Sequence, residues 1–428
     1  MHNAVKSFVV AAMSLVYQRA LADCNRQELN EDRFFFAKLA ASDELRELPE
    51  YQSCLQALLA DATFSSQLRV LAGPRGGPRF QSADAGGLMS QFVDLGAPQG
   101  KFTFDEPYFE KEYGDLEKTY YDSAIEYTAI APLNGFIASG PLQLSDTIEI
   151  IQLEGETAET RSAADWHEKV YAVSIKYSLP KAIGEDHELT PNHRRDDDAI
   201  RKAVNEQIAE VVTALRLQGI ESVYVPGVLH KTSKWSFGQS RPFPGQFLPE
   251  ITFSMSVESD WLHKFKEFWE RLQEDGVRKR SFLLTALRRF GYAHERYRSE
   301  DKIIDLLIAA EALFLSDNIY TGEIKYRLAQ RTAFFLTEAG EHRKIVFKRM
   351  KAAYDFRSTT AHGGSYKKPF PKKADGSEST MDEFVWQIQD YIRRSLLRAI
   401  YRALLPDTPL HIVRWDDLIL DGTSTLIE

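Results

Sequence analysis

Apolar residues recur at helical spacing through most of the last third of the chain, and this periodicity constrains the fold more than any other feature. The first such segment places Trp261, Phe265, Phe268 and Leu272 on one stripe of a helix. Further helices with the same period are expected over residues 282–296, 299–315, 321–336, 342–362 and 382–405. The sequence therefore predicts an all-α helical bundle for residues 259–406, with residues 407–428 as a C-terminal tail.

The rest of the chain divides into a helical start and a β-rich middle. Helices are expected over 28–41 and 43–60, so residues 1–72 are predicted to form a helical N-terminal region. A linker rich in Gly and Pro follows over 73–100. Short β-branched and aromatic runs then predict a β-rich domain over 101–258, interrupted by one helix over 197–217. The expected strands are 148–150, 170–177, 222–225 and 251–257. The fold class expected is α+β.

The first residues resemble a secretory signal without matching one well. An apolar run from Phe8 to Met13 precedes a small-x-small pattern at Ala20–Ala22, but Tyr17-Gln18-Arg19 interrupts it. Helical spacing continues through this stretch, so an amphipathic helix of a folded domain is the preferred interpretation. No segment approaches the roughly 20 apolar residues that a membrane span requires.

Cysteine and histidine usage indicates the compartment and argues against a metal site. Cys24 and Cys54 are the only cysteines, too few for a disulfide framework, which fits the reducing cytoplasm. No H-E-x-x-H motif and no Cys/His cluster is present. A cytoplasmic protein with no metal and no cofactor is therefore expected.

Charge is distributed unevenly along the chain. The formal net charge is −9, which argues against a protein that coats nucleic acid generally. Between Lys325 and Lys368, however, eleven Lys or Arg residues face only three acids, a local net charge of +8. Such a basic segment suits an anionic polymer as substrate, although a solvated helix face is an equally good interpretation of the charges alone. The expected RNA-binding residues are Lys348, Arg349, Lys351, Arg327 and Arg331.

A short motif inside this basic segment carries the candidate chemistry. Arg357, Ser358 and His362 lie within six residues at the end of an expected helix. Arginine keeps its charge and can grip a phosphate through two hydrogen bonds, and histidine exchanges protons near neutral pH. His362 would act as general base or acid, Arg357 would stabilise charge developing on the phosphate, and Ser358 could orient either. The alternative is structural: His362 caps its helix and Arg357 pairs with a buried acid.

Other residues near the motif could support it, but the helix directs Arg357 and His362 to different sides. Tyr354 shares the helical stripe of Arg357, and Asp355 lies on the neighbouring stripe with His362. Glu311 falls on the apolar stripe of an earlier helix, where a carboxylate must find a partner such as Arg327, Arg331 or Arg357. Residues 357 and 362 diverge by about 140° on an ideal helix. They can therefore meet at one phosphate only if the helix ends there or a second protomer contributes.

Several blocks in this region together resemble the ApeA-like branch of the HEPN superfamily. They are Ala286-Leu-Arg-Arg-Phe290, Glu300-Asp-Lys-Ile-Ile-Asp305, Ala309-Ala-Glu-Ala-Leu-Phe314, Tyr326-Arg-Leu-Ala-Gln-Arg331 and Arg357-Ser-x-x-x-His362-Gly363. Upstream, Ala131-Pro-Leu-Asn-Gly-Phe136 and Leu215-Arg-Leu217 are similar to the β-rich N-terminal region of the same family. The resemblance covers about residues 101–405, and residues 1–100 match no family in this way.

The resemblance implies a metal-independent endoribonuclease of bacterial anti-phage defence. It implies a homodimer of the helical domain, with RNA as substrate, Arg357 and His362 as the catalytic pair, and a phage-derived trigger or regulatory partner. The residue after the arginine is Asn, Asp or His across most of the superfamily, and is Ser358 here, as suits the ApeA-like branch. Some members bind RNA or nucleotide without cutting, so a non-catalytic binding or dimerisation module is the alternative. The RNA target and the trigger do not follow from the sequence.

Overall fold

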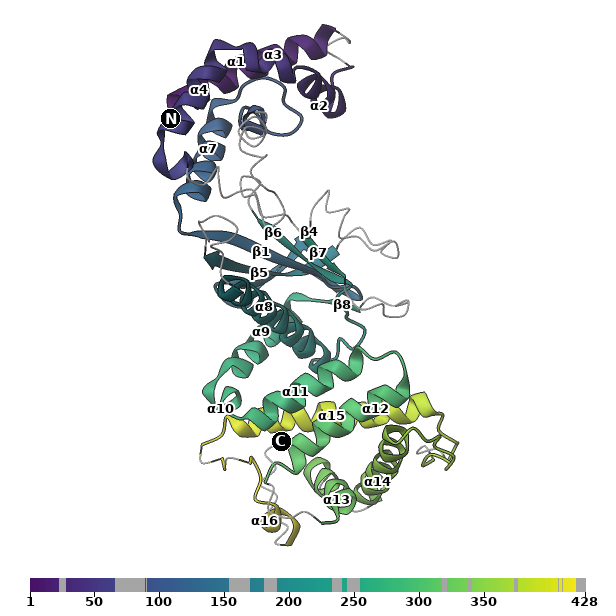
Figure 1. The fold of residues 1–428 in the computed structure, drawn as a ribbon. Helices are drawn as coiled ribbons and strands as arrows, with labels where there is room; N and C mark the ends of the chain where they lie inside the picture. The colour runs from purple at the N-terminus through teal and green to yellow at the C-terminus, as the bar shows by residue number, and fades with distance from the viewer. Residues whose placement is uncertain are drawn as a thin grey trace. The chain divides into compact units, whose positions relative to one another are not determined.

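The computed structural model combines helices and sheet, with a helical C-terminal region (Figure 1). It describes residues 1–22, 28–65, 89, 91–153, 170–180, 191–232, 241–244, 255–317, 322–337, 341–372, 376–406, 408–409 and 411–420. The chain forms two compact units, of which the first holds residues 1–127, 177–202 and 231–240. The second unit holds residues 128–176, 203–230 and 241–428.

A helical core organises the first unit. Its helices are α1 (His2–Ala22), α2 (Glu31–Ala40), α3 (Ser42–Glu47), α4 (Pro49–Ala60) and α7 (Glu106–Tyr121), with the short 3-10 helix η3 (Val93–Leu95). Helix α1 buries Val5, Phe8, Ala12 and Val16, which recur at helical spacing and meet the other helices in one apolar cluster. The amphipathic helix expected at the start of the chain is therefore present. Leu95 of η3 is buried in the same cluster, so the expected linker contributes to this core.

Two helical predictions for this unit were wrong in detail. The single helix expected over 43–60 is divided into α3 and α4, because Leu48 before Pro49 adopts extended backbone (ψ 133°). Helix α7 was not predicted, because it lies at the start of the segment expected to be β-rich. Its start is nevertheless marked by Asp105, whose side chain accepts a hydrogen bond from the Tyr108 amide at 3.1 Å.

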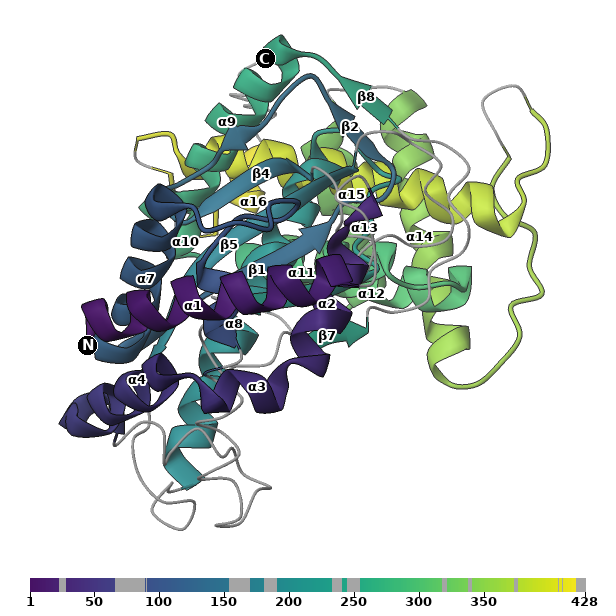
Figure 2. The same cartoon turned by 90° about the horizontal axis from the view of Figure 1, so that it is seen from above.

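A six-stranded sheet begins after α7. The strands β3 (Leu142–Gln143), β4 (Ile148–Leu153), β5 (Val170–Pro180), β1 (Ala124–Pro132), β6 (Gly227–Thr232) and β7 (Arg241–Pro244) form one six-stranded sheet in that order. Seen from above, β4, β5 and β1 lie as neighbours (Figure 2). Ile150 pairs with Val173 across the antiparallel β4–β5 ladder, and both are buried. The β-branched runs that predicted these two strands therefore pack on the core.

Not every expected strand formed. Residues 222–225 make only one isolated bridge, in which Tyr224 pairs with Asn134, so the strand prediction there was wrong. Of the expected strand 251–257, residues 255–257 form β8 (Met255–Val257), which pairs in parallel with β2 (Phe136–Ala138), and residues 251–254 lie outside the described residues. Helix α8 (Pro191–Leu217) is longer than predicted and buries Val204, Ile208, Val211 and Leu215, the register that the sequence indicated.

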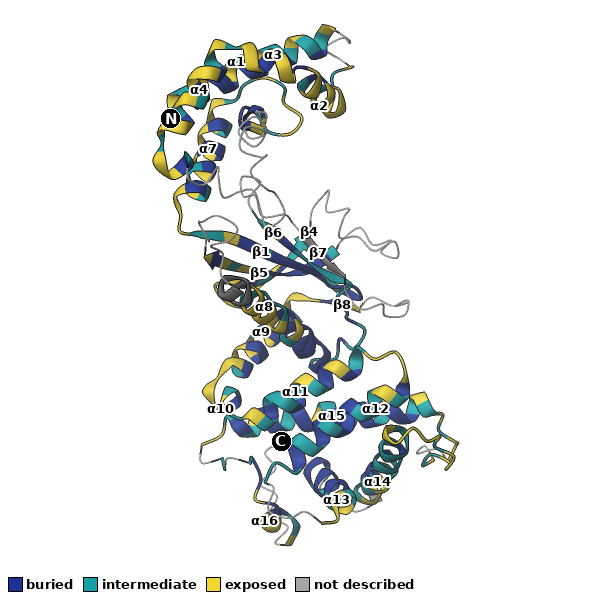
Figure 3. Ribbon diagram, in the orientation of Figure 1, coloured by how far each residue is buried: buried dark blue, intermediate teal, exposed yellow. Residues whose placement is uncertain are grey.

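Helices build the C-terminal part of the second unit. They are α9 (Ser259–Gln273), α10 (Asp275–Arg278), α11 (Ser281–His294), α12 (Ser299–Phe314), α13 (Ile324–Leu336), α14 (Glu341–Ala361), α15 (Met381–Ala403) and α16 (Trp415–Leu420). Helix α12 packs against α11, α13, α14 and α15, and its buried stripe faces them (Figure 3). The expected C-terminal tail contains α16, whose Trp415 packs edge-on against Phe314 and Phe335.

A buried carboxylate on α12 binds one arginine of α11 and one of the loop between α11 and α12. Asp305 of α12 is 2% exposed and accepts hydrogen bonds from Arg289 Nη1 at 2.9 Å and Arg296 Nε at 2.8 Å. Ser299 is the first helical residue of α12, and its hydroxyl donates to Asp382 Oδ1 at 2.5 Å. The start of α12 is thus tied to α15 by a side-chain contact instead of an N-cap.

We expect Asp305→Ala to lower the free energy of unfolding by about 2–3 kcal/mol, because two charge-assisted hydrogen bonds are lost in a buried position. Denaturant unfolding followed by circular dichroism measures the change. Asp260→Ala is the matched control, since Asp260 is exposed and pairs with Lys264 one turn along the same helix. Equal destabilisation by both substitutions would contradict the structural role of Asp305.

Candidate functional site

Helix α14 carries the Arg357–His362 motif and is fixed by its apolar face. Met350 and Ala353 are 0% exposed and Phe356 is 1% exposed, at spacings of three residues that keep them on one side of the helix. This face packs against α12, α13 and α15. Arg357 follows Phe356 directly and therefore lies at the edge of the buried face, as the helical stripe predicted.

The helix ends immediately before His362. Gly363 adopts a left-handed conformation with φ of +75°, which glycine tolerates because it has no Cβ. The amides of Gly363 and Gly364 donate to the carbonyls of Thr360 and Thr359, each at 2.9 Å, and satisfy the end of the helix. His362 is exposed in this turn, and its backbone amide donates to the Ser358 carbonyl at 3.3 Å. Its imidazole is therefore open to solvent at the end of the helix.

The Arg357 guanidinium is held only loosely by the rest of the protein. Its Nη2 lies 3.7 Å from Glu311 Oε2, a distance that makes an ion pair but is long for a hydrogen bond. Its Nε is buried and has no hydrogen-bond partner. Within the described residues no hydrogen bond or ion pair joins Arg357 to His362. The buried Nε cannot meet a ligand, but the side chain is 27% exposed, so the terminal nitrogens of the guanidinium remain open to an anionic ligand.

Burial dominates the electrostatics of Glu311. Its side chain is 28% exposed on α12, and burial raises its pKa, although the nearby Arg357 cation acts in the opposite direction. Of the three arginines that the sequence offered as partners, Arg357 is the one that pairs with it. The pair connects α12 to the motif helix.

The other residues near the motif have separate contacts. Asp355 Oδ1 accepts a hydrogen bond from Lys325 Nζ at 2.5 Å, and Lys368 lies 3.7 Å from its other oxygen. Tyr354 lies beside Arg357, with the guanidinium carbon 6.0 Å from the ring centre. Ser358 is half-buried, one residue beyond Arg357. Asp355 is therefore engaged with lysines and does not serve as the partner of Arg357.

Two of the arginines expected to bind RNA are engaged inside the bundle. Arg331 is 7% exposed and donates to both oxygens of Asp317, at 2.8 and 2.7 Å, and to the Phe314 carbonyl at 2.7 Å. Arg327 lies 3.6 Å from the same carboxylate, and both arginines help to hold the Asp317 pKa below its usual value against the effect of burial. Their placement connects the end of α12 to α13 and leaves Arg331 almost no exposed surface.

The remaining three expected RNA-binding residues lie on α14 but do not share one site. Arg349 donates to the Tyr391 hydroxyl at 2.9 Å and to the Lys372 carbonyl at 3.1 Å, which ties the following loop to α15. Lys348 is exposed, and Lys351 lies with its ammonium 5.4 Å from the Phe347 ring centre. Only Lys348 and Lys351 line a common surface feature.

That feature is a basic groove between α13 and α14, with a volume of about 500 Å³. Aromatic side chains that the sequence analysis did not select share it with the lysines, since Tyr326 and Phe347 meet edge-on at 5.3 Å. Its lining residues are Tyr326, Gln330, Ala333, Phe334, Arg343, Lys344, Phe347, Lys348 and Lys351. The sequence does indicate this groove, because Arg343, Phe347 and Lys351 recur every four residues and so share one face of α14. The groove combines cations with aromatic faces, as single-stranded nucleic-acid sites do.

The comparisons give no relative for the chain: no family model, curated protein or solved structure matches it. The function must therefore be argued from the site itself. Among the described residues, no group of three or more His, Cys, Asp or Glu side chains is placed to hold a metal ion. None of the described helices has both the length and the apolarity that crossing a membrane demands.

The raised pKa of Glu311 predicts the pH dependence of stability. A carboxyl group whose pKa is higher in the folded state adds stability below its unfolded value of about 4.5, and this contribution is lost as pH rises through the folded pKa. The melting temperature of Glu311→Gln relative to the parent should therefore increase between pH 4.5 and pH 7. Thermal unfolding at several pH values measures it. Glu270→Gln, at an exposed position on α9, should show no such trend, and a relative decrease for Glu311→Gln would contradict the prediction.

Proposed function

We propose that the protein is a metal-independent endoribonuclease of the HEPN type. The observation that carries the proposal is the state of Arg357, five residues before an exposed histidine at the same helix end. Its side chain is 27% exposed, and among the described residues its one ion pair is 3.7 Å long and its Nε has no acceptor. A weakly paired guanidinium and a solvent-accessible imidazole at one helix end suit the binding and cleavage of a phosphodiester.

The chemistry follows from these two side chains. His362 takes the proton from a ribose 2′-hydroxyl, whose oxygen attacks the adjacent phosphorus, or gives a proton to the departing 5′-oxygen. Arg357 stabilises the additional negative charge on the phosphate in the transition state. The bond to the 5′-oxygen breaks, and the products carry a 2′,3′-cyclic phosphate and a 5′-hydroxyl. Ser358 orients the imidazole or the phosphate.

A homodimer of the helical domain completes the proposed site. On a regular helix, positions 357 and 362 diverge by about 140°, so one chain presents them in different directions. Helix α14 ends at Ala361, which gives His362 some freedom, but a second copy can supply the missing group to the same phosphate. In this proposal the enzyme works in the cytoplasm as a regulated toxin of anti-phage defence, released by a phage-derived trigger or a regulatory partner.

The basic groove favours a second candidate function, that of a non-catalytic RNA-binding module. Lys348, Lys351 and the aromatic rings of Tyr326 and Phe347 could hold a single strand without any cleavage. Purified protein incubated with total RNA in EDTA distinguishes the two functions. Fragments that end in a 2′,3′-cyclic phosphate support the ribonuclease, whereas intact RNA that co-migrates with the protein supports the binding module.

Arg357→Ala and His362→Ala should each reduce RNA cleavage at least a hundredfold, because each removes a transition-state contact. Neither substitution removes a fully buried side chain, so the far-ultraviolet circular dichroism should not change. Cleavage of a fluorescent RNA measures the rates. Arg394→Ala and His263→Ala, both at exposed positions, are the matched controls and should keep the parental rate. A His362→Ala protein that cuts at the parental rate would show that His362 only ends its helix.

Mixing the Arg357→Ala and His362→Ala chains should restore cleavage if each site takes Arg from one protomer and His from the other. A dimer of one chain of each kind then contains one intact site, so activity should approach a quarter of the parental rate in a fully exchanged equimolar mixture. Dimerisation is checked by light scattering. An active monomer at nanomolar concentration would contradict the shared site.

A further inference from the structure

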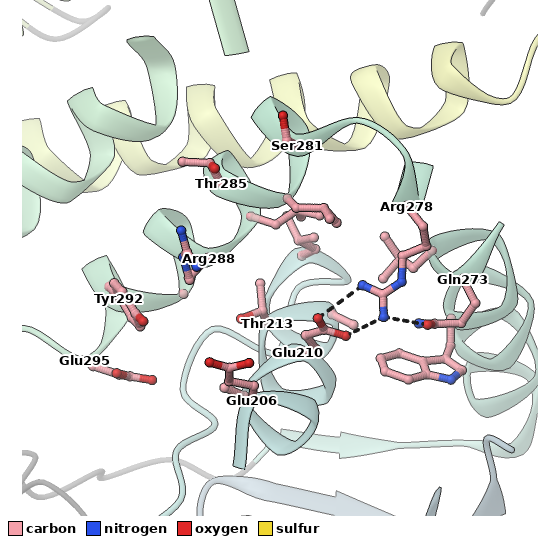
Figure 4. A pocket seen from close by; sticks show the side chains of 18 residues that line it. Glu206, Glu210, Thr213, Gln273, Arg278, Ser281, Thr285, Arg288, Tyr292 and Glu295 are labelled. Atoms are coloured by element: carbon pink, nitrogen blue, oxygen red, sulfur yellow. Dashed lines mark hydrogen bonds and ion pairs between the residues drawn. The ribbon is translucent and has the colours of Figure 1, made fainter. Parts of the chain in front are cut away.

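A pocket of about 380 Å³ lies in the second unit away from the motif helix, between α8, α9, α10 and α11 (Figure 4). Its volume is within the range of small-molecule sites in proteins. The motif residues of α14 contribute nothing to its lining, so an argument about this pocket is independent of the proposed ribonuclease.

One wall of the pocket is a row of hydrogen-bond donors on α11. Ser281, Thr285, Arg288 and Tyr292 are spaced by four, three and four residues, which places them on one stripe of the helix. In the part of the chain that the structure describes, none of the three hydroxyls and no guanidinium nitrogen of Arg288 makes a hydrogen bond or an ion pair, and all but Thr285 are exposed. Figure 4 shows these four side chains on the same helix along the pocket.

Other helical hydroxyls in this unit behave differently. Those of Thr332, Ser395 and Thr359 each donate to the carbonyl four residues earlier, at 2.7, 2.7 and 2.9 Å. Thr285 is half-buried in the middle of its helix and makes no such bond. Its hydroxyl is therefore available to a bound molecule.

Two of the three carboxylates that line the pocket, Glu210 and Glu295, already have an arginine partner. Glu210 accepts two hydrogen bonds from Arg278, at 3.1 and 2.8 Å, and Arg278 also donates to Gln273 at 2.8 Å. Glu295 lies 3.9 Å from the buried Arg216, and burial raises the pKa of this carboxyl. Glu206 and Arg288 are both exposed, so solvent screens both charges. Among the described residues, Arg288 is the cation of the pocket for which the structure shows no carboxylate partner.

The floor of the pocket is mainly aliphatic. Leu217 is buried, Leu272 is 7% exposed and Leu284 is half-buried, and all three face the pocket. Ala209, Ala214, Leu287 and Trp269 complete the apolar lining. Trp269, like Leu217 and Leu272, is almost fully buried, so Leu284, Leu287 and Ala209 supply the accessible part of this apolar lining.

We propose that this pocket binds a small amphipathic anion with an aliphatic tail and one carboxylate head, of the size of a medium-chain fatty acid. The tail lies on the leucine floor, where burial of its methylenes favours binding. The head accepts hydrogen bonds from Arg288 and from the hydroxyls of its stripe, Thr285 foremost. Binding joins α8 to α11 and so gives the second unit a ligand-dependent stability.

Isothermal titration calorimetry of the full chain with decanoate tests the proposal. Decanoate should bind, butyrate should bind at least tenfold more weakly because its tail is short, and decyltrimethylammonium should bind at least tenfold more weakly because its head is a cation. Equal affinity for the anion and the cation would overturn the assignment of the head to Arg288, and the absence of decanoate binding at millimolar concentration would overturn the site.

Three variants separate a built site from adsorption to apolar surface. Arg288→Gln should weaken decanoate at least tenfold and leave decyltrimethylammonium unchanged. Ala209→Trp fills the pocket from an exposed position and should abolish decanoate binding, with circular dichroism as the check on folding. Arg46→Gln, a surface arginine of the first unit, is the control and should bind like the parent. Decanoate binding that survives both pocket substitutions would refute the proposal.

Discussion

The candidate site depends on the apolar contact between α14 and the middle of the helical bundle. Met350, Ala353 and Phe356 are buried on one side of α14, and they fix both the rotation of that helix and its depth. Arg357 comes next in the sequence, so its guanidinium must lie at the boundary between the core and solvent. There it reaches Glu311 of α12 at 3.7 Å, close enough for electrostatic attraction but too far to satisfy its hydrogen-bond donors. A motif anchored by less apolar surface could not keep a charged group half-desolvated in this way.

The same bundle separates the basic segment into structural and exposed cations. Arg331 is buried against Asp317. Arg349 donates to Tyr391 and to the loop after the motif, so both arginines stabilise the fold. Lys348 and Lys351 instead line the groove with Phe347. The local net charge of +8 therefore overstates what a ligand encounters, since part of it is compensated internally. This division has a physical reason: a planar guanidinium can meet a carboxylate and a carbonyl at once, whereas a lysine at a helix surface keeps its ammonium in water.

Sequence reasoning was most successful where one period dominates a long segment. The helices from 259 to 403 and the register of α8 follow from apolar spacing, since nothing competes with that signal. Helix α7 was missed because its segment was assigned to the β-rich region, although Phe109, Tyr113 and Tyr120 lie on one helical stripe and Asp105 caps the helix. The strand expected over 222–225 failed because a short β-branched run becomes a strand only when a partner is adjacent along its length. The Glu311–Arg357 pair was within reach of the sequence, but the engagement of Arg327 and Arg331 by Asp317 was not, because it depends on how α12 ends beside α13.

The end of α14 determines what the motif can do. If the helix continued past residue 362, the imidazole would be fixed on a face turned away from Arg357. Gly363 prevents this by adopting φ of +75°, and the amides of the turn, rather than the imidazole, satisfy the last carbonyls. His362 is consequently not required as a capping side chain, which removes the simplest structural reason for a histidine at this position. A residue with a Cβ at position 363 would be strained in that conformation. The exposed position of the imidazole therefore depends on the glycine that follows it.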